Sequence, residues 1–375
     1  MKIGQILLIW LAAAVLWACN DTIPGSPDAD DNASGELAAR TVLIYIAADN
    51  DLTTTGDYGN ESLKNITKGA TAEALAGNNL LVYKDCKNEM PVLLRITPEG
   101  QETVIAYTED ENSGSPATLR SAIEETLRAY PAKSYGLILW SHGSNWFPSS
   151  MATTKAFGQD GSNWIELPGL QQAIPDDTFD FIIFDACYMG GIEVAYALKN
   201  KADYLIASPA EVMGDSFPYR TCLPYLFTEP ADLPAVCEDF YRYYSQSSCT
   251  IALISLKKLD KLAETTHEIM KANFSKTDTL TLKTLQRYYR PDYYNMYDFD
   301  DYIGRIATPE AYAHFQTALN EAVPVKKATP SFLLSSQGFR ITHFSGLSTF
   351  ILHPSLNEAI VNEYKKLDWY QAVYE

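Results

Sequence analysis

Cysteine is scarce in this chain, and basic residues are outnumbered by acidic ones. Six cysteines among 375 residues are too few for a scaffold held together by disulfides. The sequence has no CxxC pair and no HExxH run, so a zinc site has no support. With 29 basic against 47 acidic residues, the formal net charge is −18. A chain this acidic binds a phosphate backbone poorly, so we expect no nucleic-acid partner.

The apolar run at the start of the chain is too short to be a membrane span. Residues 3–18 are almost wholly apolar and follow a single lysine, and roughly 20 residues are needed to cross a bilayer. We interpret residues 1–18 as a signal peptide. The run ends at Ala18-Cys19, which resembles a bacterial lipoprotein box and implies lipidation of Cys19. The alternative is ordinary signal cleavage nearby, with Cys19 removed or unmodified.

Residues 19–39 have the composition of a flexible tether. Asp, Ser, Gly and Pro dominate residues 20–36, and such a composition cannot bury a core. We therefore expect an exported lipoprotein, periplasmic or on the cell surface, whose N-terminal lipid anchors it to a membrane. Its folded part is predicted to begin near Arg40.

The folded part shows strand patterns that alternate with helical ones. Continuous apolar runs of the kind buried in parallel sheets predict strands, and apolar spacing of 3.6 residues predicts helices. An alternation of this kind predicts an α/β fold with a mainly parallel central sheet and right-handed crossovers. The predicted strands are 41–48, 79–83, 92–96, 102–107, 135–140, 179–184, 204–207 and 250–254, and the predicted helices are 118–130, 191–198, 233–244 and 256–273.

The pattern changes near residue 275. Residues 331–352 resemble antiparallel strands, and residues 358–367 have helical spacing. We therefore divide the folded part into a main domain, residues 40–274, and a C-terminal α+β subdomain, residues 275–375, packed on the sheet.

Two of the predicted strands end in residues that can carry chemistry. The strand at 135–140 runs into Ser141-His142-Gly143, and the strand at 179–184 runs into Asp185-Ala186-Cys187. Ligands of open α/β sheets bind beyond the carboxyl ends of the strands. If these two strands are neighbours, about 4.8 Å separates them, and His142 and Cys187 can meet across one crevice.

A cysteine and a histidine so placed support nucleophilic catalysis. A free thiol, with a pKa near 8.5, is mostly protonated at neutral pH, and an imidazole can take its proton. The thiolate then attacks a carbonyl and forms an acyl-enzyme. The backbone N–H groups of Gly143 and Cys187 are our candidates for the oxyanion hole.

The alternative is that Cys187 is a small hydrophobic residue and His142 is structural. We give that interpretation to His267, His314, His343 and His353, and we read Cys86, Cys222, Cys237 and Cys249 as small hydrophobic residues or disulfide partners.

Four stretches resemble the clostripain-like cysteine peptidases, which belong to the group that includes caspases, gingipains and legumains. They are residues 41–52 (TVLIYIAADNDL), 139–143 (LWSHG), 184–190 (FDACYMG) and 207–219. The resemblance implies a caspase-like α/β/α sandwich over residues 40–274. It also implies endopeptidase activity toward proteins or peptides with Arg or Lys before the scissile bond.

Recognition of a basic side chain needs a carboxylate in the specificity pocket. Asp185 lies two residues before Cys187, on the same face of its strand, and Asp215 lies in the loop after the next strand. Both match positions that line the primary pocket in the resembling family. The alternatives are a structural hydrogen-bonding role for Asp185 and a solvated loop charge for Asp215.

The segment between the two motifs is predicted to be a loop that the enzyme cuts. Residues 144–165 show neither helical nor strand spacing, and Lys155 is their only basic residue. Exposed loops of small polar residues are where proteases nick chains. We therefore predict self-processing at the Lys155–Ala156 bond, and the resemblance points to a cut at a comparable place.

Catalysis of this type needs no metal or cofactor. Asp298, Asp300 and Asp301 form a carboxylate cluster, but EF-hand spacing is missing, so a solvated or arginine-paired cluster is the preferred interpretation. A calcium requirement is left open, without an assigned site.

We expect a monomer. The competing functions are a catalytically idle surface lipoprotein that binds peptides or glycans, and a hydrolase of another class that uses Cys187 as nucleophile.

Overall fold

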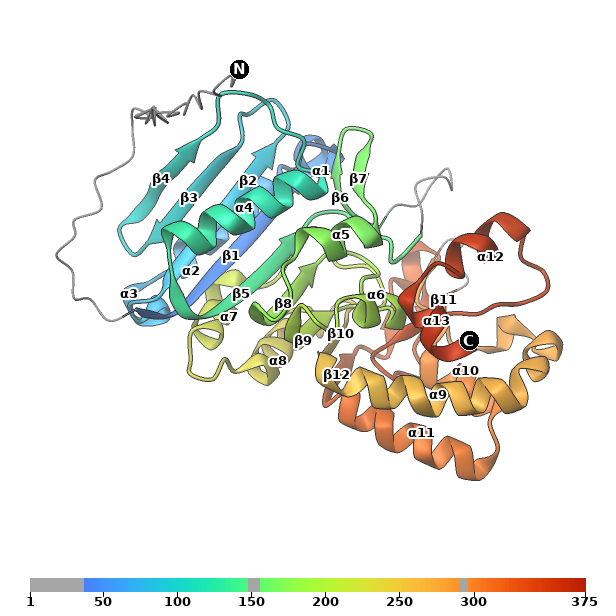
Figure 1. Cartoon of the computed structure of the whole chain (residues 1–375). Helices are drawn as coiled ribbons and strands as arrows, with labels where there is room; N and C mark the ends of the chain where they lie inside the picture. Colours follow the sequence, from blue (N-terminus) through green and yellow to red (C-terminus); the bar gives the residue numbers. More distant parts are fainter. Residues whose placement is uncertain (1–36, 148–155, 291–295) are drawn as a thin grey trace, which may run out of the picture. The chain divides into compact units, whose positions relative to one another are not determined.

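A nine-stranded sheet runs through the centre of the computed structural model, which describes residues 37–147, 156–290 and 296–375 (Figure 1). Its order is β12-β10-β9-β8-β5-β1-β2-β3-β4. The strands are β1 Ala38–Ala48, β2 Asn79–Cys86, β3 Val92–Thr97, β4 Gly100–Ala106, β5 Ala132–Trp140, β8 Phe179–Asp185, β9 Ala202–Ala207, β10 Thr250–Ser255 and β12 Val325–Ala328.

The middle of this sheet is parallel and its margins are antiparallel. Strands β2, β1, β5, β8 and β9 are parallel neighbours, whereas β3, β4, β10 and β12 pair antiparallel. Strand β1 is buried along nearly its whole length, because helices cover both faces of the sheet. The predicted mainly parallel sheet is confirmed.

Helices form a layer on each side of the sheet. One apolar core joins the sheet to α4 Pro116–Ala129, α5 Leu167–Ala173, α6 Ile192–Ala197, α9 Leu259–Asn273, α10 Phe299–Ile306, α11 Pro309–Ala322, α12 Glu358–Tyr364 and α13 Asp368–Tyr374. A second core joins the opposite face to α2 Tyr58–Gly69, α3 Ala72–Leu75, α7 Tyr219–Leu226 and α8 Leu233–Tyr244. The fold is therefore an α/β/α sandwich, as predicted.

The C-terminal residues contribute to the same structure. Strand β12 extends the main sheet through antiparallel pairing with β10. Shorter antiparallel pairs join β11 Met296–Asp298 to β15 Ser348–Phe350, and β13 Ser331–Phe332 to β14 Phe339–Arg340. Leu37–Glu375 form one contact-dense unit. The division that we placed at residue 275 stays a prediction.

The remaining elements are short. They are the helix α1 Asp51–Gly56, the hairpin strands β6 Phe157–Asp160 and β7 Asn163–Ile165, and the 3-10 turns η1 Leu256–Lys258, η2 Phe274–Thr279, η3 Leu282–Thr284 and η4 Leu334–Ser336. The hairpin corrects our expectation that residues 144–165 hold no strand. Strands of four and three residues are too short for their spacing to show in the sequence, and pairing with the chain beside His142 holds β6 in place.

No helix in the described ranges is long and apolar enough to cross a membrane. The predicted signal peptide, Cys19 and most of the predicted tether lie outside the described residues.

Candidate active site

The pairing of β5 with β8 brings the two predicted catalytic residues to one edge of the sheet. Trp140 lies opposite Asp185 in the parallel register, and the Ser141 N–H donates to the Asp185 carbonyl at 3.4 Å. His142 and Cys187 each follow two residues after that pair, so they leave the sheet side by side. The next residue shows how close the two chains are, because a Cβ on Gly143 would lie 2.5 Å from the Cys187 carbonyl oxygen. Only glycine fits there.

The turn that carries Cys187 is held by the loop after β9. The Tyr188 N–H donates to the Ala210 carbonyl and the Gly190 N–H to the Ser208 carbonyl, both at 2.8 Å. Tyr188 has a φ of 63°, in the left-handed region that non-glycine residues seldom adopt. The turn is thus a sharp one, fixed from one side by residues 208–210.

The Cys187 thiol contacts the backbone of Val212 in this structure. It lies 3.6 Å from the Val212 carbonyl oxygen, to which it donates, and 3.4 Å from the Val212 nitrogen, whose N–H it accepts. Burial raises the pKa of Cys187 to about 12, with the Glu211 charge adding to the rise and the Val212 N–H opposing it. The thiol is therefore protonated at neutral pH in this arrangement, and it needs a base before it can attack a carbonyl.

His142 forms its side-chain hydrogen bond with Asp51, which our sequence reasoning missed. The His142 Nε2 lies 2.9 Å from the Asp51 Oδ1, and Trp164 packs beside the imidazole with 6.1 Å between ring centroids. Asp51 is the first residue of α1, directly beyond β1, the neighbour of β5. The signal was present in the sequence, because the run Asp49-Asn50-Asp51 ends a buried strand at the same edge of the sheet.

The comparisons with known proteins agree with this geometry. The model of the clostripain family matches residues 44–374. The chain belongs to the clostripain family of cysteine peptidases.

Individual members of the family show the same relationship. Clostripain from Hathewaya histolytica is 30% identical over 151 residues, which are 36% of this chain and 27% of clostripain. The structure of an inactive zymogen C11 protease from Parabacteroides distasonis superposes with a TM-score of 0.83 at 36% identity, covering 91% of this chain and 99% of that one. A secreted C11 cysteine protease from Bacteroides thetaiotaomicron, solved with an irreversible peptide inhibitor, gives 0.76 at 29% identity, with 90% and 99% covered.

Asp185 and Asp215, the two predicted substrate-binding residues, occupy different environments. The Asp185 carboxylate is buried, and its Oδ2 accepts hydrogen bonds from the Phe217 N–H at 3.1 Å and the Tyr219 hydroxyl at 2.8 Å. Burial raises the pKa of Asp185 to about 7, and the hydrogen bonds from Tyr219 and Phe217 oppose the rise. Asp215 is exposed.

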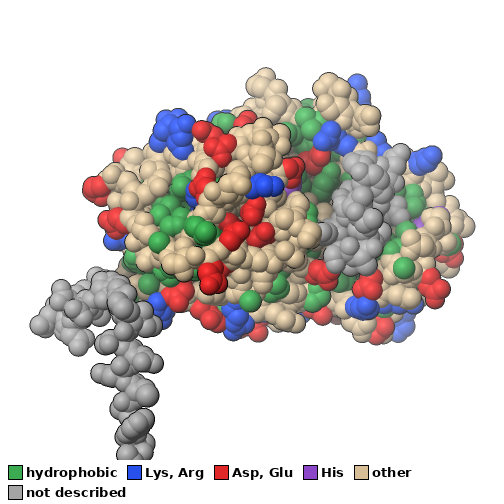
Figure 2. Space-filling model, turned by 90° about the horizontal axis from the view of Figure 1, so that it is seen from above, with side chains coloured by type: hydrophobic (Ala, Val, Ile, Leu, Met, Phe, Trp, Pro, Cys, Tyr) green, Lys and Arg blue, Asp and Glu red, His purple; other side chains and the backbone are tan. Residues whose placement is uncertain are grey.

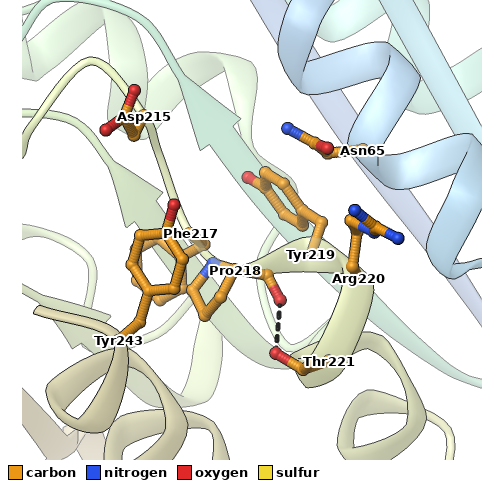
Figure 3. Close-up of a pocket in the computed structure, with 8 residues that line it drawn as sticks. All are labelled: Asn65, Asp215, Phe217, Pro218, Tyr219, Arg220, Thr221 and Tyr243. Atoms are coloured by element: carbon orange, nitrogen blue, oxygen red, sulfur yellow. Dashed lines mark hydrogen bonds between the residues drawn. The ribbon is translucent and has the colours of Figure 1, made fainter.

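Asp215 lines a cavity of about 420 Å³ (Figure 3). The other lining residues are Asn65, Phe217, Pro218, Tyr219, Arg220, Thr221 and Tyr243. Asp185 does not line this cavity, and it supports the wall through its bond to Tyr219. These contacts fit the structural alternative for Asp185, and its role in substrate binding stays a prediction. Neither His142 nor Cys187 lines the cavity, but Asp215 is only three residues from Val212, a span of about 10 Å at most.

A charged pair from the C-terminal part of the chain reaches the same loop. Arg290 binds Glu211 through two hydrogen bonds, Nε to Oε2 at 2.5 Å and Nη2 to Oε1 at 2.7 Å, and its Nη1 donates to the Ser336 carbonyl at 3.1 Å. A fork of this kind fixes the geometry of both partners. It anchors the chain directly before Val212, so residues far along the sequence help to place the Cys187 thiol.

The predicted processing bond lies at the edge of the described residues. Lys155 falls outside them, whereas Ala156 is described and fully buried. The Ser144 N–H donates to the Ala156 carbonyl at 2.9 Å, and the Gly158 N–H donates to the His142 carbonyl at 3.1 Å. The chain that follows the predicted cut is thus fixed alongside His142.

The remaining candidates from the sequence have structural roles. Cys86, Cys222, Cys237 and Cys249 are buried, and no disulfide joins the cysteines that the structure describes. Asp298 caps α10 and accepts from Tyr288 and Ser345, while Asp301 pairs with Arg305 at 3.0 Å. Asp301 is thus arginine-paired, as the preferred interpretation stated, whereas Asp298 is buried and bonded to other protein groups.

Proposed function

We propose that this chain is an exported cysteine endopeptidase in which Cys187 is the nucleophile and His142 the base. The observation that carries the proposal is the adjacent exit of these two residues from paired parallel strands, with Gly143 packed against the Cys187 carbonyl. A module that only binds peptides has no use for this arrangement. The similarity to clostripain supports this chemistry, and the matched residues span 27% of the length of clostripain.

The reaction follows from the positions of the two side chains. His142 takes the proton from the Cys187 Sγ, and the sulfur electron pair forms a bond to the carbonyl carbon of the substrate. The N–H groups of Gly143 and Cys187 would stabilise the resulting oxyanion. The C–N bond then breaks as the histidine returns its proton to the leaving amine. Water, deprotonated by His142, hydrolyses the thioester, and the proton regenerates the thiol.

Activation requires that the thiol leave Val212. In this structure the described hydrogen bonds pair Cys187 with Val212 and His142 with Asp51, so the thiol and the imidazole are not yet bonded to each other. This resting arrangement fits a chain that is made inactive, and one similar structure is described as an inactive zymogen. We propose that a cut at Lys155–Ala156 completes activation. The fixed strand after Ala156 supports this step, because it brings that bond near His142.

Specificity for Arg or Lys would rest on Asp215. Its exposed carboxylate lines a cavity whose walls include the aromatic side chains of Phe217, Tyr219 and Tyr243. Such walls suit the aliphatic stem of a long basic side chain, and the carboxylate suits its charged end. Arg220 also lines the cavity, and Figure 3 shows it on the side away from Asp215, so the cavity is not uniformly acidic.

Export and anchoring complete the proposal. The N-terminal pattern supports export, and one similar protein is described as secreted. We propose that the mature chain begins at a lipidated Cys19, whose lipid would anchor the peptidase to a membrane. We also propose that the peptidase is a monomer.

The decisive experiment measures labelling and turnover on the same preparations. Fluorogenic peptides with Arg, Lys, Ala or Asp before the scissile bond are offered to wild type and to Cys187→Ala, and each protein is also treated with a thiol alkylator. The proposal expects hydrolysis after Arg or Lys in wild type alone, with label on Cys187. Labelling without hydrolysis of any peptide would support the binding module instead.

Self-processing is tested by a time course with N-terminal sequencing. Wild type should give a new N-terminus at Ala156, while Cys187→Ala and Lys155→Ala should stay whole. Cleavage at Ala156 in pure Cys187→Ala would refute the self-cut.

A further inference from the structure

The loop after β9 carries two groups that the proposed reaction needs in opposite states. The backbone of Val212 holds the Cys187 thiol, with 3.4 Å from its nitrogen and 3.6 Å from its carbonyl oxygen to the Sγ. Three residues later, the exposed Asp215 carboxylate lines the cavity that we propose for a basic side chain. The thiol must be released for attack while Asp215 must be engaged, so one short segment lies between substrate binding and chemistry.

Val212 occupies space that a substrate needs. A carbonyl carbon about to bond to a nucleophile lies roughly 3–3.5 Å from it. The Val212 peptide stands at a similar separation from the Cys187 Sγ, so the two compete for the space around the sulfur. The thiol also donates its hydrogen to the Val212 carbonyl, whereas the reaction requires that His142 take that proton. Attack therefore begins only after Val212 has moved.

Firm contacts lie on both sides of residues 212–215. Before them, the guanidinium of Arg290 binds the Glu211 carboxylate through two hydrogen bonds. After them, the buried Ser216 accepts a hydrogen bond at its carbonyl from the Tyr244 hydroxyl at 2.7 Å. The two ends of the segment are therefore fixed, and a movement that frees the thiol is confined to the four residues between them.

Residues 212–215 themselves are lightly held. Their described hydrogen bonds are the pair between Val212 and the thiol and one from the Ser216 N–H to the Met213 carbonyl at 2.9 Å. The latter closes a turn that has Asp215 near its tip. The Met213 side chain packs against two apolar clusters, and methionine adapts to altered surroundings through its rotatable bonds. The turn can therefore shift as a unit and carry Val212 with it.

We propose that residues 212–215 form a gate, and that a guanidinium or primary ammonium group bound to Asp215 opens it. Binding draws the turn toward the cavity and withdraws Val212 from Cys187. The inference rests on the proposed function, because it takes the Asp215 cavity as the site of the basic side chain. Specificity would then include the reactivity of the thiol as well as affinity, since a peptide without a basic residue leaves Val212 in place.

The exposure of Asp215 gives such a ligand a reason to prefer the open gate. A ligand shifts a two-state equilibrium only when it binds one state more tightly. With Asp215 exposed, a cation bound there remains largely in water, where charge pairs are weak. A turn that moves into the cavity brings the pair against the aromatic side chains of Tyr219 and Tyr243, where it is less hydrated and therefore stronger.

General attraction of cations has to be separated from binding at Asp215. Figure 2 looks down on the side where the β6–β7 hairpin lies in Figure 1, and acidic side chains gather over it. The hairpin pairs with the chain at Gly143, so this side includes the region of the active site. An acidic surface concentrates cations near it without a defined site. The test therefore needs a neutral analogue of the ligand and a variant that loses a different exposed carboxylate.

The rate of Cys187 alkylation by iodoacetamide, with and without n-butylguanidine, tests the gate on the full chain. Lys155→Ala is added so that the predicted processing bond stays intact during the assay, and peptide mapping assigns the label to Cys187. We expect saturating butylguanidine to accelerate alkylation by about fivefold or more. Butylurea, which has a similar shape and no charge, should leave the rate unchanged.

Thermodynamic linkage supplies a second measurement that involves no rate. An alkyl group on the Cys187 Sγ excludes Val212, so the alkylated protein is held with its gate open. It should bind butylguanidine more tightly than the protein with a free thiol, by the same factor as the acceleration. Calorimetric titration of the two forms gives that ratio of Kd values.

Two variants locate the effect. Asp215→Asn keeps the shape of the side chain, and it should remove both the acceleration and the gain in affinity. Asp110→Asn removes an equal charge from another exposed loop position and should retain both. The rates with and without ligand are compared within each variant, so a change in the basal alkylation rate does not enter.

The proposal fails if butylguanidine leaves alkylation of the parent unchanged or slows it, or if Asp215→Asn keeps the acceleration. Peptide hydrolysis judges the proposed function separately. Butylguanidine that competes with an Arg peptide but does not accelerate alkylation overturns the gate and leaves the proposed function standing. Acceleration that depends on Asp215, in a protein that hydrolyses no peptide, supports the gate and rejects the endopeptidase.

Discussion

The nucleophile side and the base side of the active site are built in different ways. Cys187 lies in a turn whose backbone is bonded to residues 208–210 on one side and, through the Gly190 carbonyl and the Ser348 N–H at 2.9 Å, to β15 on the other. His142 is partly exposed, and its imidazole is held by one bond to Asp51, whose side chain is 68% exposed. The nucleophile is therefore fixed by buried backbone hydrogen bonds, and the base is fixed by the solvent-accessible pair of His142 and Asp51. Substitutions on the two sides should therefore have different effects.

The C-terminal residues strengthen this contrast. Glu193, two residues after the Cys187 turn ends at Gly191, accepts from the Phe350 N–H at 2.8 Å and from the Tyr364 hydroxyl at 3.1 Å, while Arg290 holds Glu211. No comparable brace from the C-terminal part reaches His142 among the described hydrogen bonds. The nucleophile side thus depends on packing across the whole chain.

The largest effect is expected from removal of the nucleophile itself. Cys187→Ala should abolish peptide hydrolysis while Tm stays within about 2 °C, because the thiol lies at a strand end and its bonds to Val212 are weak. His142→Ala should lose nearly as much, since the pair acts as a unit. Turnover and Tm are measured together. Cys222→Ala, a buried core thiol, is the matched control and should lower Tm while leaving kcat per folded molecule unchanged.

A smaller loss of peptidase activity is expected when Asp215 is replaced. Asp215→Ala should lower kcat/KM for an Arg substrate by a factor equivalent to about 2–5 kcal/mol of transition-state stabilisation, because a partly desolvated charge pair is lost. The rate of Cys187 alkylation should not change. Asp110→Ala removes another exposed loop carboxylate, outside this cavity, and serves as the control. If kcat/KM of Asp215→Ala stays within twofold of wild type, Asp215 is not part of the specificity pocket.

Asp185 should show its effect in the pH dependence of stability. Burial raises the pKa of Asp185 in the folded chain to about 7, above its ordinary value near 3.8, so the folded state holds this proton more tightly. Asp185 therefore makes its full contribution to the free energy of unfolding below about pH 4. That contribution falls by at most about 4 kcal/mol as the pH rises toward 7. Asp185→Asn removes this titration, so the fall in Tm between pH 4 and pH 8 should shrink. An unchanged fall would mean that Asp185 is ionised in the folded chain.

The smallest effect is expected on the base side. Asp51→Asn should lower kcat by about fivefold and leave KM unchanged, because exposed charge pairs contribute up to about 1 kcal/mol. Glu61→Gln, an exposed carboxylate on α2, controls for the loss of charge. A variant with wild-type kcat would show that Asp51 does not position His142.

The sequence alone predicted the central strands and the meeting of His142 and Cys187 at one edge of the sheet, for a shared physical reason. Strands buried on both faces must be continuous apolar runs, so their ends are readable, and the residues beyond those ends meet at one edge of a parallel sheet. Strand β8 begins at Phe179 as predicted, and helix α8 matches its prediction at Leu233–Tyr244. The helix α11 Pro309–Ala322 was not predicted.

Long-range contacts could not be predicted from the sequence, because the residues that make them are far apart along the chain. Arg290 follows Glu211 by 79 positions, and no local spacing signals that pair. Asp51 precedes His142 by 91 positions, and only its place at the end of a buried strand indicates that the two could meet. The burial of Asp185 behind Tyr219 depends on how the loop after β9 folds back over β8. The β6–β7 hairpin was missed for a similar reason, since part of its pairing is with the chain at Gly143.

The sequence by itself determined the α/β class, the positions of the central strands along the chain and the choice of His142 and Cys187 as catalytic candidates, because burial in a parallel sheet imposes a local apolar pattern. Only the tertiary structure decided which carboxylates are free to act. Asp298 and Asp301 are satisfied by protein groups, and Asp185 accepts a hydrogen bond from Tyr219, whereas Asp215 is exposed and lines a cavity. A carboxylate looks the same in any sequence, and its chemistry is set by the solvent and hydrogen bonds that the fold leaves to it.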